Sequence, residues 1–390
     1  MPEAYIVAAA RTAGGRKKGR LSGWHPADLA GEVLNALAGR TGIDPALVED
    51  VIMGCVGQAG EQGNNVARGA VLASRFPESV PATSVDRQCG SSQQALHFAA
   101  QGVMSGTQDI VIAAGVESMT RVPMGTPVIL PHQAGLGGPM SPRQKERYPN
   151  IQFSQFMGAE MVAAKYGLTK DELDEFSYNS HQKGIAATQA GAFKDEIVAI
   201  EITDAEGNKT LHTVDEGIRF DASLDGIRAV KLLQENGRLT AASSSQICDG
   251  ASGVMIVSEA GLKRLGVKPL ARIHHLSVTG GDPVIMLEAP IPATKRALAK
   301  AGMKIDDIDL FEVNEAFASV PVAWLKDTGA DPARLNVNGG AIALGHPLGA
   351  SGTKLMATLV HALHARGKRF GLQTMCEGGG MANVTIIERL

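Results

Sequence analysis

Two distant stretches of this 390-residue chain repeat the same order of elements, and no other feature restricts the fold as much. An apolar strand is expected at 50–54 and another at 310–314, each after a turn that contains glycine. In both stretches a glycine-containing turn then opens a helix, and a second apolar strand follows at 109–116 and at 370–376. The two stretches share few identical residues, but they share the same order of strands, turns and helices. The repeat therefore predicts two similar α/β halves that pack face to face.

Helical spacing of apolar residues follows each glycine turn. The helix after Cys89 is expected to stop before Gly106, and the helix after Gly349 is expected to end at 366–367. Each helix is followed by a strand, and a strand–helix–strand order joins parallel strands by a helical crossover. The sequence therefore predicts parallel strands in both halves.

A middle segment, 119–247, interrupts the repeat. Prolines and glycines are so frequent between 120 and 149 that no regular element is expected there. Helical patterns follow at about 158–166 and 170–191, and a buried strand is expected at 250–259. We expect this segment to lie over the carboxyl ends of the strands, where open α/β sheets bind substrates. The predicted domains are 1–118 with 248–269 for the N-terminal half, 119–247 for the inserted loop domain, and 270–390 for the C-terminal half.

Charge and cysteine content argue against several classes of protein. The chain carries 37 basic and 40 acidic residues, a net charge of −3, so neither nucleic acid nor a membrane is expected as a partner. Its four cysteines form no CxxC pair, so neither a metal site nor a dithiol redox motif is expected. Free thiols fit a reducing compartment, and the sequence shows neither a signal-peptide pattern nor an apolar run of ~18 residues. A soluble cytoplasmic protein is the expectation.

Cys89 lies between an extended stretch, 81–85, and an amphipathic helix. The start of a helix supplies partial positive charge and free N–H groups, which lower the pKa of a thiol and favour the thiolate. Gly90 lets a ligand approach the backbone closely. The competing interpretation is a buried, inert cysteine. Its position at a helix start makes Cys89 a candidate nucleophile.

His346 lies in a glycine-rich stretch, 336–352, which predicts a tight loop of fixed shape. Pro347 stiffens the turn, and a histidine held so rigidly suits a general base that must reach one atom. The alternative is a phosphate-binding loop. The stretch lacks the Gly-Lys-Ser/Thr ending of a Walker A motif, so the catalytic interpretation is favoured.

Two further residues follow apolar strands. Cys376 precedes consecutive glycines, 378–380, whose backbone N–H groups could hold a developing oxyanion. A buried thiol beside a strand-end turn is the alternative. Asn314 could cap the next helix, or it could hold a water molecule or a carbonyl group.

Together these segments resemble the thiolase family, in order and spacing, over nearly the whole chain. The matching blocks are 86–91, 314–318, 339–352 and 376–380. The resemblance implies an α/β fold of two duplicated βαβαβαββ halves, packed as α-β-α-β-α layers, with an inserted loop domain. It also implies a homodimer or homotetramer that exchanges acyl groups between coenzyme A (CoA) thioesters, with acyl-CoA and CoA as substrates and no permanently bound cofactor.

The same resemblance assigns roles to residues. Cys89 is the nucleophile that carries the acyl group, His346 is its base, and Cys376 is the second acid/base. Asn314, through a water molecule, joins His346 in one oxyanion hole, and the backbone N–H groups of Cys89 and Gly378 form the other. Ser245 corresponds to a serine that contacts the pantetheine arm, and Arg219 corresponds to an arginine near the nucleotide end of CoA.

Two departures from the family pattern bear on the substrate. Acetoacetyl-specific members usually carry His-Met-Gly where this chain has Phe156, Met157 and Gly158, and a familiar Leu-Arg-Pro sequence is absent at 229–233. An apolar Phe156 favours a longer or bulkier acyl chain. The sequence therefore predicts a degradative 3-ketoacyl-CoA thiolase of fatty acid β-oxidation.

Four other functions compete with that prediction. A biosynthetic acetoacetyl-CoA thiolase shares the same residues. A ketoacyl synthase-type condensing enzyme pairs its cysteine with two histidines, or with His and Asn, whereas the C-terminal partner here is Cys376. A non-catalytic CoA- or lipid-binding scaffold would not need all four catalytic residues. A Cys–His hydrolase would leave the second cysteine without a role.

Overall fold

The computed structural model describes residues 2–204 and 206–390. In the N-terminal half every predicted strand and helix is found within a few residues of its expected bounds. The elements are β1 (Tyr5–Thr12), β2 (Gly15–Arg16), α1 (Pro26–Thr41), β3 (Asp50–Gly54), α2 (Val66–Ala73), β4 (Ala82–Val85), α3 (Ser91–Met104), β5 (Ile110–Ser118), β9 (Cys248–Val257) and α9 (Glu259–Leu265).

The C-terminal half repeats this order. Its elements are β10 (Ala271–Gly280), α10 (Pro290–Ala301), β11 (Leu310–Val313), α11 (Ser319–Thr328), α12 (Ala341–Leu344), α13 (Ser351–Ala365), β12 (Phe370–Glu377) and β13 (Met381–Arg389). A parallel bridge between Phe311 and Leu335 takes the place that β4 has beside β3.

The strand order makes the duplication explicit. Along the sheet the order is β11-β12-β13-β10-β1-β9-β5-β3-β4, so each half reads the same outward from the β1–β10 junction. Strands joined by helical crossovers are parallel, as predicted: β3 with β4 and β5, and β11 with β12. Strands β9 and β13 are antiparallel to their neighbours, and so is the junction, where Tyr5 pairs with Arg272. The sheet is therefore mixed, and its two halves are joined through β1 and β10.

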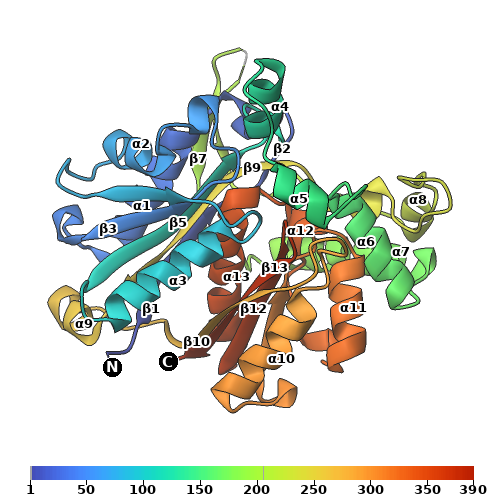
Figure 1. Ribbon diagram of the computed structural model, residues 1–390. Coiled ribbons are helices and arrows are strands. Elements are labelled where there is room, and N and C mark those ends of the chain that lie inside the picture. The colour runs from blue at the N-terminus through green and yellow to red at the C-terminus, as the bar shows by residue number, and fades with distance from the viewer. Residues whose placement is uncertain (1, 205) are drawn as a thin grey trace.

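Burial divides the molecule into five layers, α-β-α-β-α, as the resemblance implied. One outer core lies under α1 and α2, and another lies under α10 and α11. The central core is shared by α3, α13 and strands of both halves, so these two helices lie between the two halves of the sheet (Figure 1). Small side chains such as Ala95 and Ala99 on α3 allow the close packing that this middle layer requires.

The inserted segment contains more regular structure than expected. It consists of α4 (Thr126–Gln133), α5 (Pro142–Arg147), α6 (Gln155–Lys165), α7 (Lys170–Gln189), β6 (Ile197–Val198), β7 (Ile200–Thr203), β8 (Lys209–His212) and α8 (Leu224–Arg228). The prediction of no regular element at 120–149 was wrong. Pro127 and Pro142 stand in the first turns of α4 and α5, where the missing N–H has no partner to lose.

A buried ion cluster ties the inserted segment to the N-terminal half. Arg11 at the end of β1 contacts Glu196 at 2.5 Å and Asp215 at 2.8 Å, and all three side chains are buried. A buried charge is stable only when it is paired, so removing either carboxylate would leave an uncompensated guanidinium. None of the described helices combines the length and apolarity that a membrane span requires.

Candidate active site

Cys89 lies in a sharp turn between β4 and α3. Gln88, the residue before it, adopts φ +51°, a conformation that L-residues seldom hold. Side chains maintain the turn: Asp86 accepts from the Gln88 N–H at 2.7 Å, and Ser91 Oγ accepts from the Arg87 N–H at 2.9 Å. Strain that neighbouring hydrogen bonds hold in place is common at functional sites. The turn leaves residue Cys89 only partly exposed to solvent, with its sulfur enclosed by protein atoms.

The environment of Cys89 does not favour the thiolate, which corrects the expectation drawn from its place at a helix start. Burial of the sulfur raises the pKa of Cys89 to about 12, and a negative charge on Glu377 acts in the same direction. These effects outweigh the partial charge of the helix start. At neutral pH Cys89 is therefore a thiol, and its activation requires a base.

His346 meets that requirement because its protonation and tautomer are fixed. Ser351 Oγ donates to the Pro347 carbonyl oxygen at 2.8 Å, so it accepts from His346 Nδ1–H at 2.5 Å. The other nitrogen, Nε2, therefore carries a lone pair, and Asn314 Nδ2 lies 3.4 Å from it. Burial, reinforced by the positive charge of Lys354, lowers the pKa of His346 to about 3. The imidazole is neutral and available as a base.

The helices that follow Cys89 and His346, α3 and α13, pack directly on each other at their first turns. Ser92 Oγ at the start of α3 accepts from the Thr353 N–H at the start of α13, at 3.0 Å. Gly352 allows this approach, since a Cβ at that position would overlap the backbone of Gln93. The loop before α13 therefore lies against the first turn of α3.

Cys376 and Gly378, at the end of β12, lie against the turn that holds Cys89. Cys376 is fully buried, and its pKa is raised well above the ordinary value by burial and by the proximity of Cys89. A Cβ at Gly378 would lie 2.8 Å from Gln88 Oε1, so the glycine backbone faces the turn that holds Cys89. The structure thus brings the two predicted thiols and the predicted backbone donor together.

Asn314 directly follows β11 and does not cap a helix. The next helix, α11, starts five positions later at Ser319, so the capping alternative was wrong. The Asn314 side chain is buried, its Nδ2 faces His346, and no described residue gives its Oδ1 a partner. Its amide is therefore available to a group that binds beside His346.

A cavity of about 220 Å³ opens beside His346. Mostly apolar side chains line it: Met119, Met124, Gln155, Phe156, Leu233, Ala241, Ser244, Ser245, Gln246, Ile247, Ala316, Phe317 and Leu348. Phe156 packs edge to face on Phe317 with ring centroids 5.4 Å apart. Met157, its neighbour, is 52 % exposed and absent from the lining. The structure therefore places Phe156 and Ser245 in this cavity, but not Met157.

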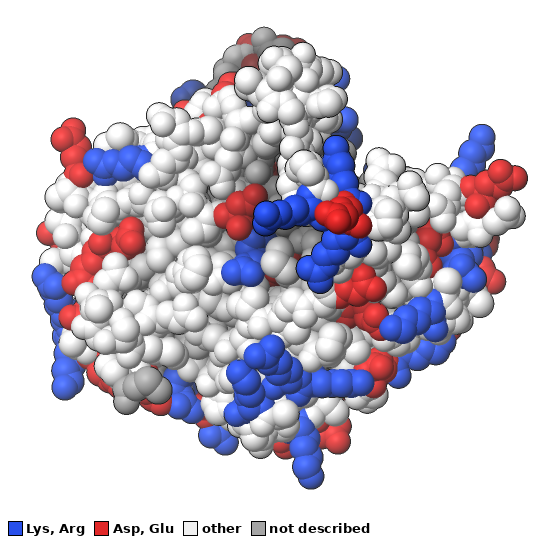
Figure 2. All heavy atoms as spheres, in the orientation of Figure 1, with Lys and Arg blue, Asp and Glu red and all other residues white. Residues whose placement is uncertain are grey.

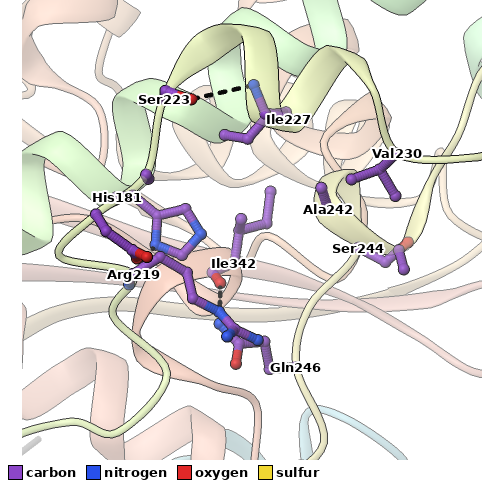
Figure 3. A pocket seen from close by; sticks show the side chains of 13 residues that line it. His181, Arg219, Ser223, Ile227, Val230, Ala242, Ser244, Gln246 and Ile342 are labelled. Atoms are coloured by element: carbon purple, nitrogen blue, oxygen red, sulfur yellow. Dashed lines mark hydrogen bonds between the residues drawn. The ribbon is translucent and has the colours of Figure 1, made fainter.

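A second cavity of about 360 Å³ continues from the first, since Ala241, Ser244 and Gln246 line both. Arg219 lies here with His181, whose Nδ1 accepts from the Arg219 N–H at 3.2 Å. Figure 3 shows Arg219 and Gln246 on one side of this cavity, with Val230 and Ala242 across from them. The two cavities form one path from Arg219 at the surface to His346.

Sequence reasoning missed Gln246, which lines both cavities and hydrogen-bonds to the segments around them. Its carbonyl oxygen accepts from the His346 N–H at 3.1 Å. Its side chain donates to the carbonyl oxygens of Gly217 and Ile342 at 2.7 and 2.8 Å. Nothing in the local sequence around Gln246 distinguishes it from a surface glutamine.

Basic side chains gather near the centre of the face shown in Figure 2, with acidic ones among them, around a hollow that lies below α5 of Figure 1. Helix α5 itself carries three exposed basic residues, Arg143, Lys145 and Arg147. This part of the inserted segment therefore presents positive charge to an approaching ligand.

Comparison with known proteins agrees with this geometry. Models of the thiolase N-terminal domain and C-terminal domain match residues 4–260 and 267–389. A steroid 3-ketoacyl-CoA thiolase, FadA6, of Mycobacterium tuberculosis is 50% identical over 100% of this chain and 95% of its own length. A 3-ketoacyl-CoA thiolase of Pseudoalteromonas translucida is 41% identical over 100% of both chains. The crystal structure of the Bacillus anthracis acetyl-CoA acetyltransferase is 34% identical, with a TM-score of 0.91, and covers 100% of this chain and 99% of its own.

The duplicated halves, the inserted segment and both cavity-lining regions are thus matched by relatives along their whole length, and the chain belongs to the thiolase family of acyltransferases.

Proposed function

We propose that this thiolase cleaves 3-ketoacyl-CoA by transferring the acyl group to Cys89 and then to CoA. One observation carries the proposal: a neutral histidine with an accepting Nε2 stands at the end of two connected cavities. It lies in the loop before α13, whose first turn packs against the first turn of the helix that follows Cys89. Matches to thiolases along the whole chain favour acyl transfer over the ketoacyl synthase, scaffold and hydrolase alternatives.

In the first half-reaction His346 Nε2 takes the proton of the Cys89 thiol as the sulfur attacks the 3-keto carbonyl carbon. The bond between C2 and C3 then breaks, which leaves the acyl group on Cys89 and an acetyl-CoA enolate. Cys376 gives its thiol proton to the enolate carbon and becomes a thiolate. A base positioned in this way contributes about 10²- to 10⁴-fold to a rate.

The second half-reaction restores both thiols. CoA transfers its thiol proton to the Cys376 thiolate and attacks the acyl group on Cys89. The Cys89 sulfur leaves and recovers its proton from His346. Because the acyl-enzyme is itself a thioester, this exchange is close to thermoneutral and the same residues serve condensation in the opposite direction.

Two oxyanion sites are assigned from the resemblance to the thiolase family. The backbone N–H groups of Cys89 and Gly378 hold the oxygen of the tetrahedral intermediate. Asn314 and His346, through a water molecule, hold the oxygen of the enolate. Donors of this kind contribute about 2.7 to 4 kcal/mol each where they have been removed singly.

CoA lies along the path between the two cavities in this proposal. Ser245 contacts the pantetheine arm, and Arg219 stands near the nucleotide end. A cation at the outer end and polar groups along a largely apolar path match a ligand that is anionic at one end and narrow along its length.

The acyl group of the substrate is proposed to be longer or bulkier than acetyl. Phe156 and Phe317 make the cavity beside His346 apolar, which favours hydrocarbon over a short polar acyl group. Relatives named for steroid 3-ketoacyl-CoA and for 3-ketoacyl-CoA agree with this choice, whereas a relative from Chromobacterium violaceum, 41% identical, is named acetyl-CoA acetyltransferase. Measuring kcat/KM for acetoacetyl-CoA and for a long-chain 3-ketoacyl-CoA tests this preference, and we expect the higher value for the long-chain substrate. A strong preference for acetoacetyl-CoA would contradict the proposal.

A homodimer or homotetramer is proposed as the working assembly. Strand β4 is the outermost strand on its side of the sheet and is only half-buried, so it has one edge without a strand partner among the described residues. Sedimentation equilibrium is expected to give a mass two or four times that of one chain.

Mass spectrometry of the intact protein tests the central step. After brief mixing with a 3-ketoacyl-CoA, the wild-type chain is expected to gain the mass of the acyl group, and Cys89→Ala is not. Cys376→Ala serves as the matched control, because it keeps the nucleophile and should still show some adduct. An adduct of equal yield in Cys89→Ala would refute the proposed nucleophile.

A further inference from the structure

Glu377 is a buried carboxyl group that the reaction above does not use. It follows Cys376 at the end of β12 and is fully buried. Its Oε1 accepts from the Asn383 N–H at 3.1 Å, while Oε2 is buried without a partner among the described residues. A buried carboxylate normally collects several donors, so a carboxyl group with one donor is poorly suited to carry charge.

The carboxyl group lies against the backbone of the catalytic turn. A Cβ at Gly90 would overlap Oε1 and Cδ of Glu377, so the glycine that follows the nucleophile makes room for this side chain. Gly90 has an ordinary φ of −87°, hence contact with Glu377, rather than backbone conformation, is what a side chain there would disturb. Glu377 therefore stands directly behind Cys89.

The N-terminal half provides an internal comparison at the equivalent strand position. Glu117 near the end of β5 is also buried, but it accepts from the N–H groups of Val56, Gly57 and Gly349 at 2.8–2.9 Å and from Gln62 at 2.7 Å. These donors, together with the Cys55 thiol at 4.0 Å, allow Glu117 to serve as a structural acceptor. Glu377 has one donor and a nucleophile as its neighbour.

Few charges surround Glu377. Arg87, from the catalytic turn, is the cation that faces it, and no ion pair within 4 Å joins them among the described residues. Cys89 faces Glu377 from the turn, and Cys376 faces it from the same strand. Asn383, whose N–H donates to Glu377, contacts His97 of α3 through its side-chain amide. His97 is neutral, because burial lowers its pKa to about 3.

We propose that Glu377 is a positioning residue that controls the charge of the nucleophile: as a neutral acid it permits the Cys89 thiolate, and as a carboxylate it opposes that thiolate. Burial raises the pKa of Glu377 to about 8, so the group is mostly neutral at pH 7 and mostly ionised at pH 9. Ionisation places a second negative charge beside the sulfur and raises the pKa of Cys89 further. Thiolate formation is thus hindered above pH 8, where a lone thiol would ionise more readily.

The inference rests on the proposed function only in taking Cys89 as the nucleophile, and it can be tested without substrate. Iodoacetamide alkylates thiolates, and peptide mapping assigns each adduct to one cysteine. We expect the Cys89 alkylation rates of Glu377→Gln and wild type to agree within about twofold at pH 6.5. At pH 9.5 the variant should react about tenfold faster, because glutamine cannot ionise. A ratio that stays constant across this range would overturn the proposal.

Two controls separate charge from packing. Glu117→Gln changes the equivalent buried carboxyl group, whose charge raises the pKa of Cys89 less than that of Glu377 does. Its alkylation rate relative to wild type should therefore vary with pH much less than that of Glu377→Gln. Wild type alone also carries the signature: the logarithm of its alkylation rate should rise with pH, flatten near pH 8 and rise again with an offset of about tenfold. A straight line through pH 8 would contradict the proposal even if Glu377→Gln failed to fold. Failure of the acyl-adduct experiment, by contrast, would leave this pH signature untouched.

Discussion

The two halves of this molecule have the same strand order but connect their last two strands differently. In the C-terminal half, β12 and β13 are joined by Gly378, Gly379 and Gly380 alone. In the N-terminal half, the connection between β5 and β9 is the inserted segment, 119–247. The short connection places Gly378 beside the turn that holds Cys89, whereas the long one lines most of the path that leads to His346. Duplication thus supplied two facing helix starts, and divergence of one connection gave them a substrate path.

The comparison assigns the nucleophile to the N-terminal half and its base to the C-terminal half, and His346→Gln tests that assignment most severely. Glutamine cannot take the Cys89 proton, so we expect kcat to fall about 10³-fold. The residual rate should rise with pH, since hydroxide can then form the thiolate. Stopped-flow measurement of acyl-adduct formation isolates this step.

Ser351→Ala is the matched control for that variant. It keeps the imidazole but removes the acceptor of Nδ1–H, so the tautomer is no longer fixed. A decrease of about tenfold in kcat is expected. Equal losses in the two variants would mean that His346 acts through its loop conformation rather than as a base.

The facing helix starts depend on two glycines, and replacing each by alanine should have different consequences. A Cβ at Gly352 would meet the backbone of Gln93, whereas one at Gly90 would meet the end of the Glu377 side chain. Backbone cannot yield as a side chain can, so Gly352→Ala is expected to lower the free energy of unfolding by about 3 kcal/mol and Gly90→Ala by about 1 kcal/mol.

Adding Glu377→Ala should recover most of the stability lost in Gly90→Ala and none of that lost in Gly352→Ala. Urea unfolding of the single and double variants measures both differences. Recovery in both cases would show that the carboxyl group acts on the whole interface between the helices.

The repeat predicted much of this arrangement, because strand and helix periodicity is a local property. The bounds of β3 follow from its apolar run, and the ends of α3 and α13 follow from helical spacing and the glycines after them. The meeting of the two helix starts was not predicted, because it depends on long-range contacts such as that between Ser92 and Thr353. The roles assigned to Cys89 and His346 remain proposals for experiment.

What could not be predicted depends on contacts between distant residues. The pKa of Cys89 is set by burial and by Glu377, which lies far away in the sequence. Met157 points outward although its neighbour Phe156 lines the cavity, and only the packing of α6 on the C-terminal half decides which of them faces inward. Prolines at 120–149 indicated irregular chain, yet two of them stand at helix starts, where proline is tolerated.

The central helices also differ in what they bury, and acid should expose the difference. His97 on α3 is buried where α13 has Ala357, counting from the first residue of each helix. The unfolded chain protonates His97 below about pH 6.5, whereas the folded chain does so only near pH 3, so stability falls as the pH drops below 6.5. At pH 5 this histidine should account for about 2 kcal/mol of lost stability.

Urea unfolding at pH 7 and pH 5 measures that loss. His97→Gln removes the titrating group, so the decrease between the two pH values should be about 2 kcal/mol smaller than in wild type. His132→Gln, at an exposed position on α4, should lose as much as wild type. If His97→Gln lost as much stability between pH 7 and pH 5 as wild type does, the acid sensitivity would belong to other buried groups.

The inserted segment also differs from the halves in its charge near the substrate path, and neutralising α5 should have a modest effect. Arg143, Lys145 and Arg147 are exposed, so they act on CoA by attraction at a distance rather than by direct contact. We expect replacement of all three by glutamine to raise KM for CoA about three- to fivefold, with a much smaller effect on kcat. The distance over which charges interact in solution, the Debye length, falls to ~3 Å at 1 M salt, so the difference in KM from wild type should vanish there.

A matched control replaces Lys295, Arg296 and Lys300 by glutamine on α10, in the outer layer of the C-terminal half. This variant removes equal charge far from the path, so its KM for CoA should stay within twofold of wild type. An equal rise in both triple variants would show that CoA responds to net charge, and the inserted segment would then have no steering role beyond lining the cavities.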